Sequence, residues 1–155
     1  MSDATQTDRE IVLTRVLDAP RELVWSAWTD PAQIPGWFGP KGFTTTVHEM
    51  DLRPGGTWRF TMHGPDGVDY ENVAVYDEVT EPERLAYTYG PDEEGHPGFV
   101  STVTFDDEAG KTRITLRTVF ESAAERDRQI EEIGAIDGGN QTLDRLERHL
   151  ARRRS

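Results

Sequence analysis

The chain has 155 residues, and 17 Lys and Arg against 29 Asp and Glu give a formal net charge of −12. This length suits one domain that can bury a core and a ligand-sized cavity. Cysteine is absent, which excludes disulfides, thiolate metal sites and cysteine nucleophiles. The acidic balance disfavours nucleic-acid binding, which needs Lys and Arg to neutralise phosphates. The polar start of the chain and the lack of a long apolar run favour a cytoplasmic protein without a membrane span.

The first part of the chain predicts one strand followed by two short helices. Alternating and β-branched residues over 11–17 indicate the strand, and an acid followed by Pro20 marks the first helix. Asp30 and Gln33 have the spacing of a capping box, which predicts a second short helix. Two aromatic residues beside Gly and Pro at 37–40 then indicate a stiff loop.

The middle of the chain predicts an antiparallel meander of six strands. Apolar residues alternate with polar ones, and turn residues recur at short intervals. Because alternate residues point to one face, Trp58, Phe60 and Met62 are expected to face inward. The strands are expected near 43–51, 57–63, 68–79, 84–90, 99–106 and 111–120. With the first strand they make a sheet of about seven strands.

The last part predicts one long amphipathic helix over the sheet. A capping box at 122–125 opens it, and apolar residues trace one face from 130 to 150. Glycines at 134 and 138–139 lie inside it, so either the helix bends there or another group approaches its backbone closely. Because a twisted sheet draws away from a straight helix, we expect a cavity between the two.

This order of elements resembles the helix-grip fold of the SRPBCC superfamily, which is also called START-like or birch-pollen-allergen-like. Over about residues 9–151, the chain resembles the branch named for the C-terminal domain of the activator of heat-shock protein 90 ATPase. The segments that carry the resemblance are Arg15–Trp25, Trp37–Pro40, Asp51–Gly56 and Pro82–Leu85. The resemblance implies an α+β fold in which a curved antiparallel sheet and the C-terminal helix over its concave face hold a hydrophobic ligand.

The same resemblance suggests how the chain is divided. We expect a single START-like domain at 9–152, a disordered segment at 1–8 and a basic tail at 153–155. The expected state is a monomer or a weak homodimer.

The predicted ligand-binding residues are mostly aromatic and apolar residues of the inward face. Trp37 is a candidate for the pocket mouth, because it lies in a breaker-rich loop outside any periodic stripe. Asn140 stands where the branch often has Trp after Gly; it either makes the pocket more polar or turns to solvent. The full set is Trp37, Phe38, Trp58, Phe60, Met62, Tyr70, Tyr87, Tyr89, Val103, Phe105, Leu116 and Asn140.

Motifs for catalysis, metal binding or phosphate binding are not found in the sequence. The four histidines lack the spacing of a metal site, and the serines are not in a nucleophile elbow. We therefore expect no catalytic residue, no cofactor and no metal.

Three functions remain open. The leading hypothesis is a module that binds a small apolar or aromatic ligand. The alternatives are a cavity enzyme of the aromatase/cyclase type, using Tyr70, Tyr87, Tyr89 or His63, and a co-chaperone-like domain that stimulates heat-shock protein 90 ATPase.

Overall fold

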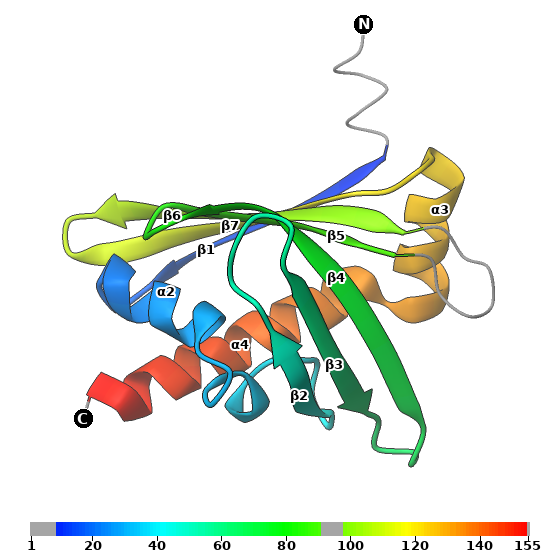
Figure 1. The fold of residues 1–155 in the computed structure, drawn as a ribbon, viewed down its shortest axis with the longest axis horizontal. Coiled ribbons are helices and arrows are strands. Elements are labelled where there is room, and N and C mark those ends of the chain that lie inside the picture. The colour runs from blue at the N-terminus through cyan, green and yellow to red at the C-terminus, as the bar shows by residue number, and fades with distance from the viewer. Residues whose placement is uncertain (1–8, 91–97, 155) are drawn as a thin grey trace, which may run out of the picture.

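The computed structural model describes residues 9–90 and 98–154, and it has the α+β helix-grip fold that the sequence predicts (Figure 1). The expectation of disorder at 1–8 lies outside the described residues. In chain order the elements are β1 (Glu10–Leu17), α2 (Arg21–Thr29), the 3-10 turn η1 (Ile34–Gly36), β2 (Thr44–Met50), β3 (Thr57–His63), β4 (Asp69–Thr80), β5 (Arg84–Tyr89), β6 (Phe99–Glu108), β7 (Lys111–Val119), α3 (Ala123–Arg128), the π-helical turn η2 (Gln129–Ile133) and α4 (Ala135–Arg154).

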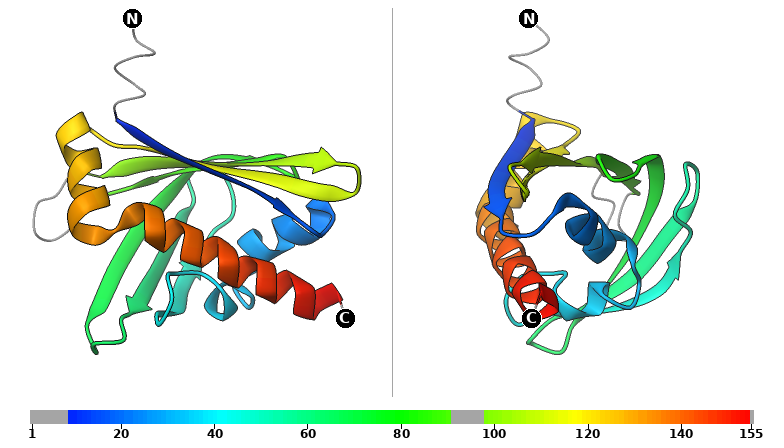
Figure 2. Two further views of the ribbon diagram at one scale, coloured as in Figure 1. Left: turned by 180° about the vertical axis from the view of Figure 1, so that it is seen from behind. Right: turned by 90° about the vertical axis from the view of Figure 1, so that its left-hand side faces the viewer.

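The seven strands form one antiparallel sheet in the order β1-β7-β6-β5-β4-β3-β2. Strands β2 to β7 each pair with their neighbours in sequence, as expected for a meander. The first strand instead pairs with the last, from Glu10 opposite Val119 to Leu17 opposite Thr112. Irregular register in β2 and in β4 adds local bending, because a bulge increases strand twist. The sheet therefore curves around α2 and α4 (Figure 2).

The core lies between the concave face of the sheet and these two helices. Alternation along the strands places Trp58 and Phe60 of β3 inside, each 1% exposed. From the helical side, α2 contributes Trp25 and Trp28, and α4 contributes Leu143 and other apolar residues. The hydrophobic effect of burying this face holds the helices on the sheet.

The short helices differ from the prediction. The N-cap of α2 is Pro20, and no side chain caps it. After α2, the second helix is only the three-residue turn η1. Asp30 accepts hydrogen bonds from the Ala32 N–H at 2.9 Å and from Gln33 Nε2 at 3.2 Å. These bonds make a local turn that differs from a capping box, because the backbone N–H groups of Asp30 and Gln33 donate to the main-chain carbonyls of Ser26 and Asp30.

The C-terminal helix is also divided, where the sequence suggested one continuous helix. Ser122 caps α3 by accepting from the Glu125 N–H at 3.1 Å, as the capping box predicts. A π-helical turn follows, and Gly134 then adopts a left-handed conformation with φ of 73° before α4 begins. Glycine takes this conformation without a steric penalty. The bend and the close approach, which the sequence left as alternatives, both occur: the chain breaks at Gly134 and packs closely at Gly139.

Candidate ligand site between the sheet and the C-terminal helix

A cavity of about 580 Å³ lies between the concave face and the N-terminal half of α4. Its walls come from the loop before β2, from four strands of the sheet and from the first turns of α4. The lining residues are Phe38, Gly39, Pro40, Phe43, Phe60, Met62, Tyr70, Asn72, Tyr89, Phe99, Gly134, Ala135, Gly138, Gly139 and Thr142. A site of this size and character is typical of those that take small molecules.

Five of the predicted site residues line this cavity. They are Phe38, Phe60, Met62, Tyr70 and Tyr89. A sixth, Leu116, lines a second cavity of about 160 Å³ on the β1 side of the sheet. The predicted inward alternation accounts for Phe60, Met62 and Tyr89, whereas Phe38 reaches the cavity from the loop before β2 and Tyr70 is 46% exposed at its edge.

Five other predicted residues are packed in the core and do not line either cavity described here. They are Trp37, Trp58, Tyr87, Val103 and Phe105. The sequence pattern identifies their inward direction, but it does not show how deep along the sheet each one lies. Trp58, for example, packs against two other rings, with centroid distances of 4.4 Å to Phe60 and 5.4 Å to Tyr87.

Trp37 is a core residue, so the prediction that it lies at the pocket mouth is wrong. It is fully buried, and its indole Nε1 donates a hydrogen bond to the Ala27 carbonyl at 3.1 Å. Its ring meets the edge of Trp28 at a centroid distance of 4.9 Å. The tight turn η1 directs the side chain back under α2, and the next residue, Phe38, lines the cavity instead.

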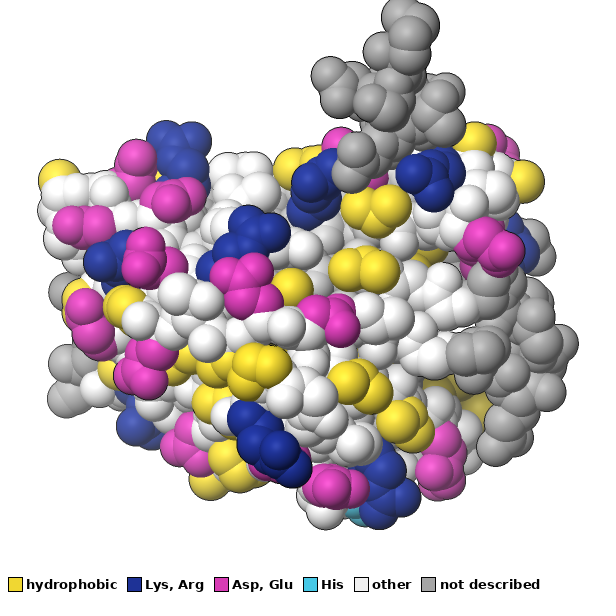
Figure 3. All heavy atoms as spheres, turned by 45° about the horizontal axis from the view of Figure 1, so that its top comes forward, with side chains coloured by type: hydrophobic (Ala, Val, Ile, Leu, Met, Phe, Trp, Pro, Cys, Tyr) yellow, Lys and Arg dark blue, Asp and Glu magenta, His cyan; other side chains and the backbone are white. Residues whose placement is uncertain are grey.

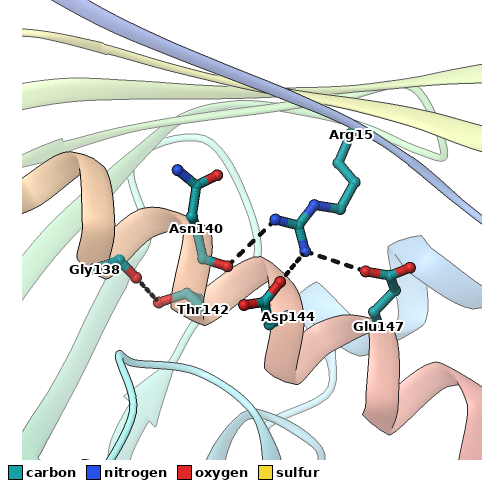
Figure 4. Close-up of polar contacts among 6 residues, drawn as sticks. All are labelled: Arg15, Gly138, Asn140, Thr142, Asp144 and Glu147. Carbon is teal, nitrogen blue, oxygen red and sulfur yellow. Dashed lines mark hydrogen bonds and ion pairs between the residues drawn. The ribbon is translucent and has the colours of Figure 1, made fainter.

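Asn140 does not line the cavity, so its expected role in ligand binding is not supported. The residue is exposed, and its main-chain carbonyl accepts a long hydrogen bond from Arg15 at 3.5 Å (Figure 4). The helical register of α4 explains this, because the cavity is lined by Gly138, Gly139 and Thr142, and Asn140 lies on another face.

The residues that the prediction missed lie mostly on α4 and in the loop before β2. Small residues at Ala135 and Gly138 leave space for the cavity, and Gly139 lets α4 pack closely against Leu13 beside it. The cluster of glycines in a helical segment was the available signal. Phe43 and Phe99 were missed because Phe43 lies just before β2 and Phe99 is the first residue of β6, where the alternating pattern is weakest.

Arg145 fixes the loop that forms one wall of the cavity. Its Nη1 donates to the carbonyls of Gly39, Pro40 and Phe43 at 2.9, 3.0 and 3.0 Å. All three of these residues line the cavity. Burial lowers the pKa of Arg145, and the nearby Arg148 lowers it further. The guanidinium, whose ordinary pKa is far above neutral, stays charged and makes strong bonds to these carbonyls.

Arg15 ties the other side of α4 to the edge strand β1. Its Nη1 lies 2.6 Å from Asp144 Oδ1 and 3.1 Å from Glu147 Oε1, and Figure 4 shows both carboxylates converging on it. The two acids are spaced one turn apart on α4, which lets one guanidinium reach both. Arg15 and Arg145 together hold the helix over the cavity from opposite sides.

His149 anchors the end of α4 in the core. Its Nε2 lies 2.9 Å from Gln33 Oε1, while Gln33 Nε2 donates to Ser26 Oγ at 2.9 Å. The amide oxygen of Gln33 is therefore the acceptor, and His149 donates from Nε2. Burial lowers the pKa of His149, and the positive charges of Arg152 and Arg153 lower it further.

The tyrosines of the inner face are neutral phenols. Burial is the main cause that raises the pKa of Tyr76, Tyr87 and Tyr89, and repulsion between their phenolate forms adds to it. Tyr89 lines the large cavity, and its ring lies 5.5 Å from that of Tyr87. These groups can donate or accept hydrogen bonds, but they do not supply charge at neutral pH.

His63, a candidate acid or base for the cavity enzyme, lies on the opposite face of the sheet. Its Nδ1 is 2.7 Å from Asp69 Oδ1, and its Nε2 is 2.8 Å from Thr46 Oγ1. The neighbouring Met62 lines the cavity, and the alternation of β3 turns His63 outward. Within the described residues, no group of three or more His, Asp or Glu side chains could hold a metal ion.

The model of one protein family, the activator of Hsp90 ATPase homolog 1-like proteins, matches residues 18–151. The chain belongs to this family. Membership agrees with the helix-grip fold of the SRPBCC superfamily and with the four motifs quoted from the sequence. No curated protein matches the chain.

Solved structures from several bacteria share this fold. A protein from Nitrosomonas europaea is 28% identical, with a TM-score of 0.86 over 95% of this chain and 97% of that chain. A protein from Arthrobacter aurescens is 26% identical, with a TM-score of 0.84 over 94% and 88%. The AHSA1-like protein from Aeromonas hydrophila is 24% identical, with a TM-score of 0.72 over 92% of each chain, and this likeness concerns the fold alone.

The described part of the chain contains no helix with the length and apolar character required for a membrane span.

Proposed function

We propose that this member of the activator of Hsp90 ATPase homolog 1-like family binds a small apolar ligand between its sheet and its C-terminal helix. The observation that carries the proposal is the cavity of about 580 Å³, which aromatic and aliphatic side chains line. A ligand that buries about 200 Å² of apolar surface there would gain about 5 kcal/mol before the entropy cost of binding. Because a Kd of 1 μM requires about 8 kcal/mol, this amount of burial supports a Kd of about 0.2 mM at best, and a ligand that buries more apolar surface would bind more tightly.

The experiment uses N-phenyl-1-naphthylamine, an uncharged dye whose fluorescence rises in apolar surroundings. Titration of the purified protein should give a saturable rise in fluorescence and a higher melting temperature, because a ligand of the folded state stabilises it. Two variants of α4 receive the same new side chain. Gly138→Leu fills the cavity and should abolish the signal, whereas Asn140→Leu adds leucine on an exposed position and should keep it.

The outcome separates binding from loose association with the surface. Equal dye signals in both variants would place the dye outside the cavity and contradict the proposal. Absence of a saturable signal in the unmodified protein would contradict it as well. Circular dichroism of both variants shows whether each is folded before the comparison is made.

The enzyme alternative has less support from the site. Acid–base catalysis needs a group that titrates near the working pH within reach of the substrate. Tyr70 and Tyr89 are the titratable side chains among the described lining residues, and burial moves the pKa of Tyr89 away from neutral. A cavity with this lining favours holding a ligand over transforming it.

The co-chaperone alternative finds its support on the outer face of the sheet. Val12, Val16, Val73, Val75 and Val100 are 39% to 50% exposed there. Figure 3 shows apolar side chains interspersed with charged ones on this side of the molecule. An apolar outer face could contact another protein. Adding the protein to a bacterial Hsp90 ATPase assay tests this role, and an unchanged rate excludes it.

A further inference from the structure

The large cavity has a smaller neighbour with a different character. The second cavity, of about 160 Å³, is lined by Ile11, Leu13, Phe99, Leu116, Thr118, Phe120, Gln129, Ala135 and Gly139. Three residues, Phe99, Ala135 and Gly139, line both cavities. The two spaces are thus adjacent compartments under the same stretch of α4.

Phe99 stands between the two compartments. Its ring lies 4.6 Å from Tyr89, which lines the large cavity, and 5.3 Å from Phe120, which lines the small one. On the helical side, Ala135 and Gly139 line both compartments, and Gly139 packs so closely against Leu13 of β1 that a Cβ would overlap Leu13 Cδ1. A single aromatic ring therefore separates the compartments on the sheet side.

Two polar side chains and one tyrosine hydroxyl of the large cavity make hydrogen bonds within the protein. Thr142 Oγ1 donates to the Gly138 carbonyl at 2.9 Å, and Asn72 Nδ2 donates to the Tyr70 carbonyl at 3.0 Å. Tyr89 shares a hydrogen bond with Tyr87. Most of the remaining lining residues are aromatic, aliphatic or glycine, so this compartment suits the apolar body of a ligand.

The small cavity keeps hydrogen-bonding capacity. The Thr118 hydroxyl lies 3.4 Å from Ser101 Oγ, a long contact that leaves it able to bind another group. Gln129 Nε2 donates to Glu125 Oε2 at 3.1 Å, which leaves its amide oxygen as an acceptor. One hydroxyl group of a ligand could accept from Thr118 and donate to Gln129.

The lining also selects against charge. None of the described residues that line either cavity carries a formal charge at neutral pH. A charged group buried here would lose its hydration without gaining a partner of opposite charge, which costs several kcal/mol. The ligand that fits is uncharged.

From these observations we infer that the two cavities form one site for an elongated, uncharged, largely apolar molecule with a single hydroxyl group. The apolar body occupies the large cavity, and the hydroxyl group reaches Thr118 and Gln129 in the small one, past the ring of Phe99. This inference rests on the proposed function and names the chemical class of the ligand.

The experiment measures displacement of N-phenyl-1-naphthylamine by four ten-carbon compounds that differ only in the end group. Decan-1-ol should displace the dye most strongly, followed by 1-chlorodecane, which lacks the hydroxyl group. Decanoate and decylammonium should each be at least about tenfold weaker than decan-1-ol at neutral pH, because their charge is unpaired in the site. Across alkan-1-ols from hexanol to decanol, affinity should rise about fourfold per methylene group.

Two variants locate the hydroxyl group and the partition. Thr118→Val keeps the shape of the side chain and should weaken decan-1-ol about fivefold while leaving 1-chlorodecane unchanged. Thr115→Val, on the outward side of the same strand, is the matched control and should change neither. Phe99→Ala removes the ring between the compartments and should strengthen decan-1-ol more than hexan-1-ol.

Each result has a defined meaning. Equal displacement by decan-1-ol and decanoate, or no selective loss in Thr118→Val, would overturn the inference while dye binding still supports the proposed function. If the Thr118→Val protein fails to fold, the Phe99→Ala variant still tests the inference. Equal increases in affinity for decan-1-ol and hexan-1-ol in that variant would also overturn it. Failure of the dye to bind would contradict the proposed function itself.

Discussion

Gly138 and Gly139 are neighbours in α4, yet an added methyl group would meet different surroundings at each. At Gly138 the nearest atom to a Cβ would be Pro40 Cβ at 3.7 Å, an ordinary contact. At Gly139 the Cβ would overlap Leu13 Cδ1, and the Leu13 side chain would have to move. One glycine therefore leaves open space, and the other allows close packing.

This difference predicts opposite effects of two alanine substitutions. Gly138→Ala should raise the free energy of unfolding by about 0.5–1 kcal/mol, because alanine loses less conformational entropy in a helix. Gly139→Ala has the same gain, but the displaced Leu13 should make it less stable than Gly138→Ala by about 1 kcal/mol or more. Urea denaturation of the two variants measures both values. Equal stabilities would show that Leu13 moves at little cost.

At the scale of single residues, the sequence predicts whether a side chain points inward better than it predicts whether that side chain lines the cavity or lies in the core. Alternation along the strands correctly turns Phe60, Met62 and Tyr89 toward the interior. It cannot distinguish a lining residue from Trp58, which lies deeper in the core. Loop residues are harder still, because the direction of Trp37 depends on the turn η1 and on contacts with α2 that no local pattern encodes.

At the scale of elements, α4 is positioned by a few long side chains as well as by its apolar face. Arg145 bonds three carbonyls of the loop before β2, and Arg15 reaches from β1 to two acids of the helix. The first interaction orders a wall of the cavity. The second is more exposed, so it contributes less to stability.

Arg145→Met should lower the free energy of unfolding by about 1–3 kcal/mol, because three carbonyls lose a charged donor. It should also weaken binding of the naphthylamine dye, since Gly39, Pro40 and Phe43 line the cavity. Arg148→Met removes an exposed arginine from the same helix and is the control. Thermal unfolding and dye titration of both variants test this. A loss of stability without any loss of dye affinity would show that the loop keeps its place without Arg145.

The elements themselves were largely predictable from the sequence. Period-two alternation and turn residues predict the strands, and the box at Ser122 predicts where the C-terminal helical region begins. The division of that region at Gly134 was not predictable, because a glycine in a helical pattern is compatible with a break or with close packing. The choice depends on the strand opposite, which the pattern of the helix does not contain.

At the scale of the whole molecule, His149 links stability to pH. Its folded pKa lies below the ordinary value of 6.5, because burial and two nearby arginines disfavour the charged form. The unfolded chain therefore binds more protons than the folded chain just below pH 6.5. Stability is complete above this pH and falls as the pH decreases through 6.5 toward the folded pKa.

The free energy of unfolding should thus decrease between about pH 7.5 and about pH 5 in the unmodified protein. His149→Gln removes the titrating group and should make this decrease smaller. Asp30, whose pKa is lowered by hydrogen bonds from Ala32 and Gln33, titrates in a more acidic range and is present in both proteins. Urea denaturation at several pH values checks the prediction. Identical pH profiles would exclude His149 as the cause.

The overall architecture could be predicted because element order and motifs agree, and a cavity follows from a helix laid on a twisted sheet. The position of the cavity along the sheet could not be predicted, since it depends on which α4 residues are small and on how Arg145 places the loop. The partition at Phe99 also requires knowledge of two strands and a helix together. Such features arise from several elements at once.

The pairing of β1 with β7 has a consequence for biosynthesis. The partner of residues 10–17 lies at residues 112–119, so β1 has no neighbour in the sheet until residues 112–119 have left the ribosome. The helix that closes the concave face is made later still. The nascent chain must therefore keep β1 unpaired while residues 18–111 are made, and the concave face is covered only after α4 has emerged.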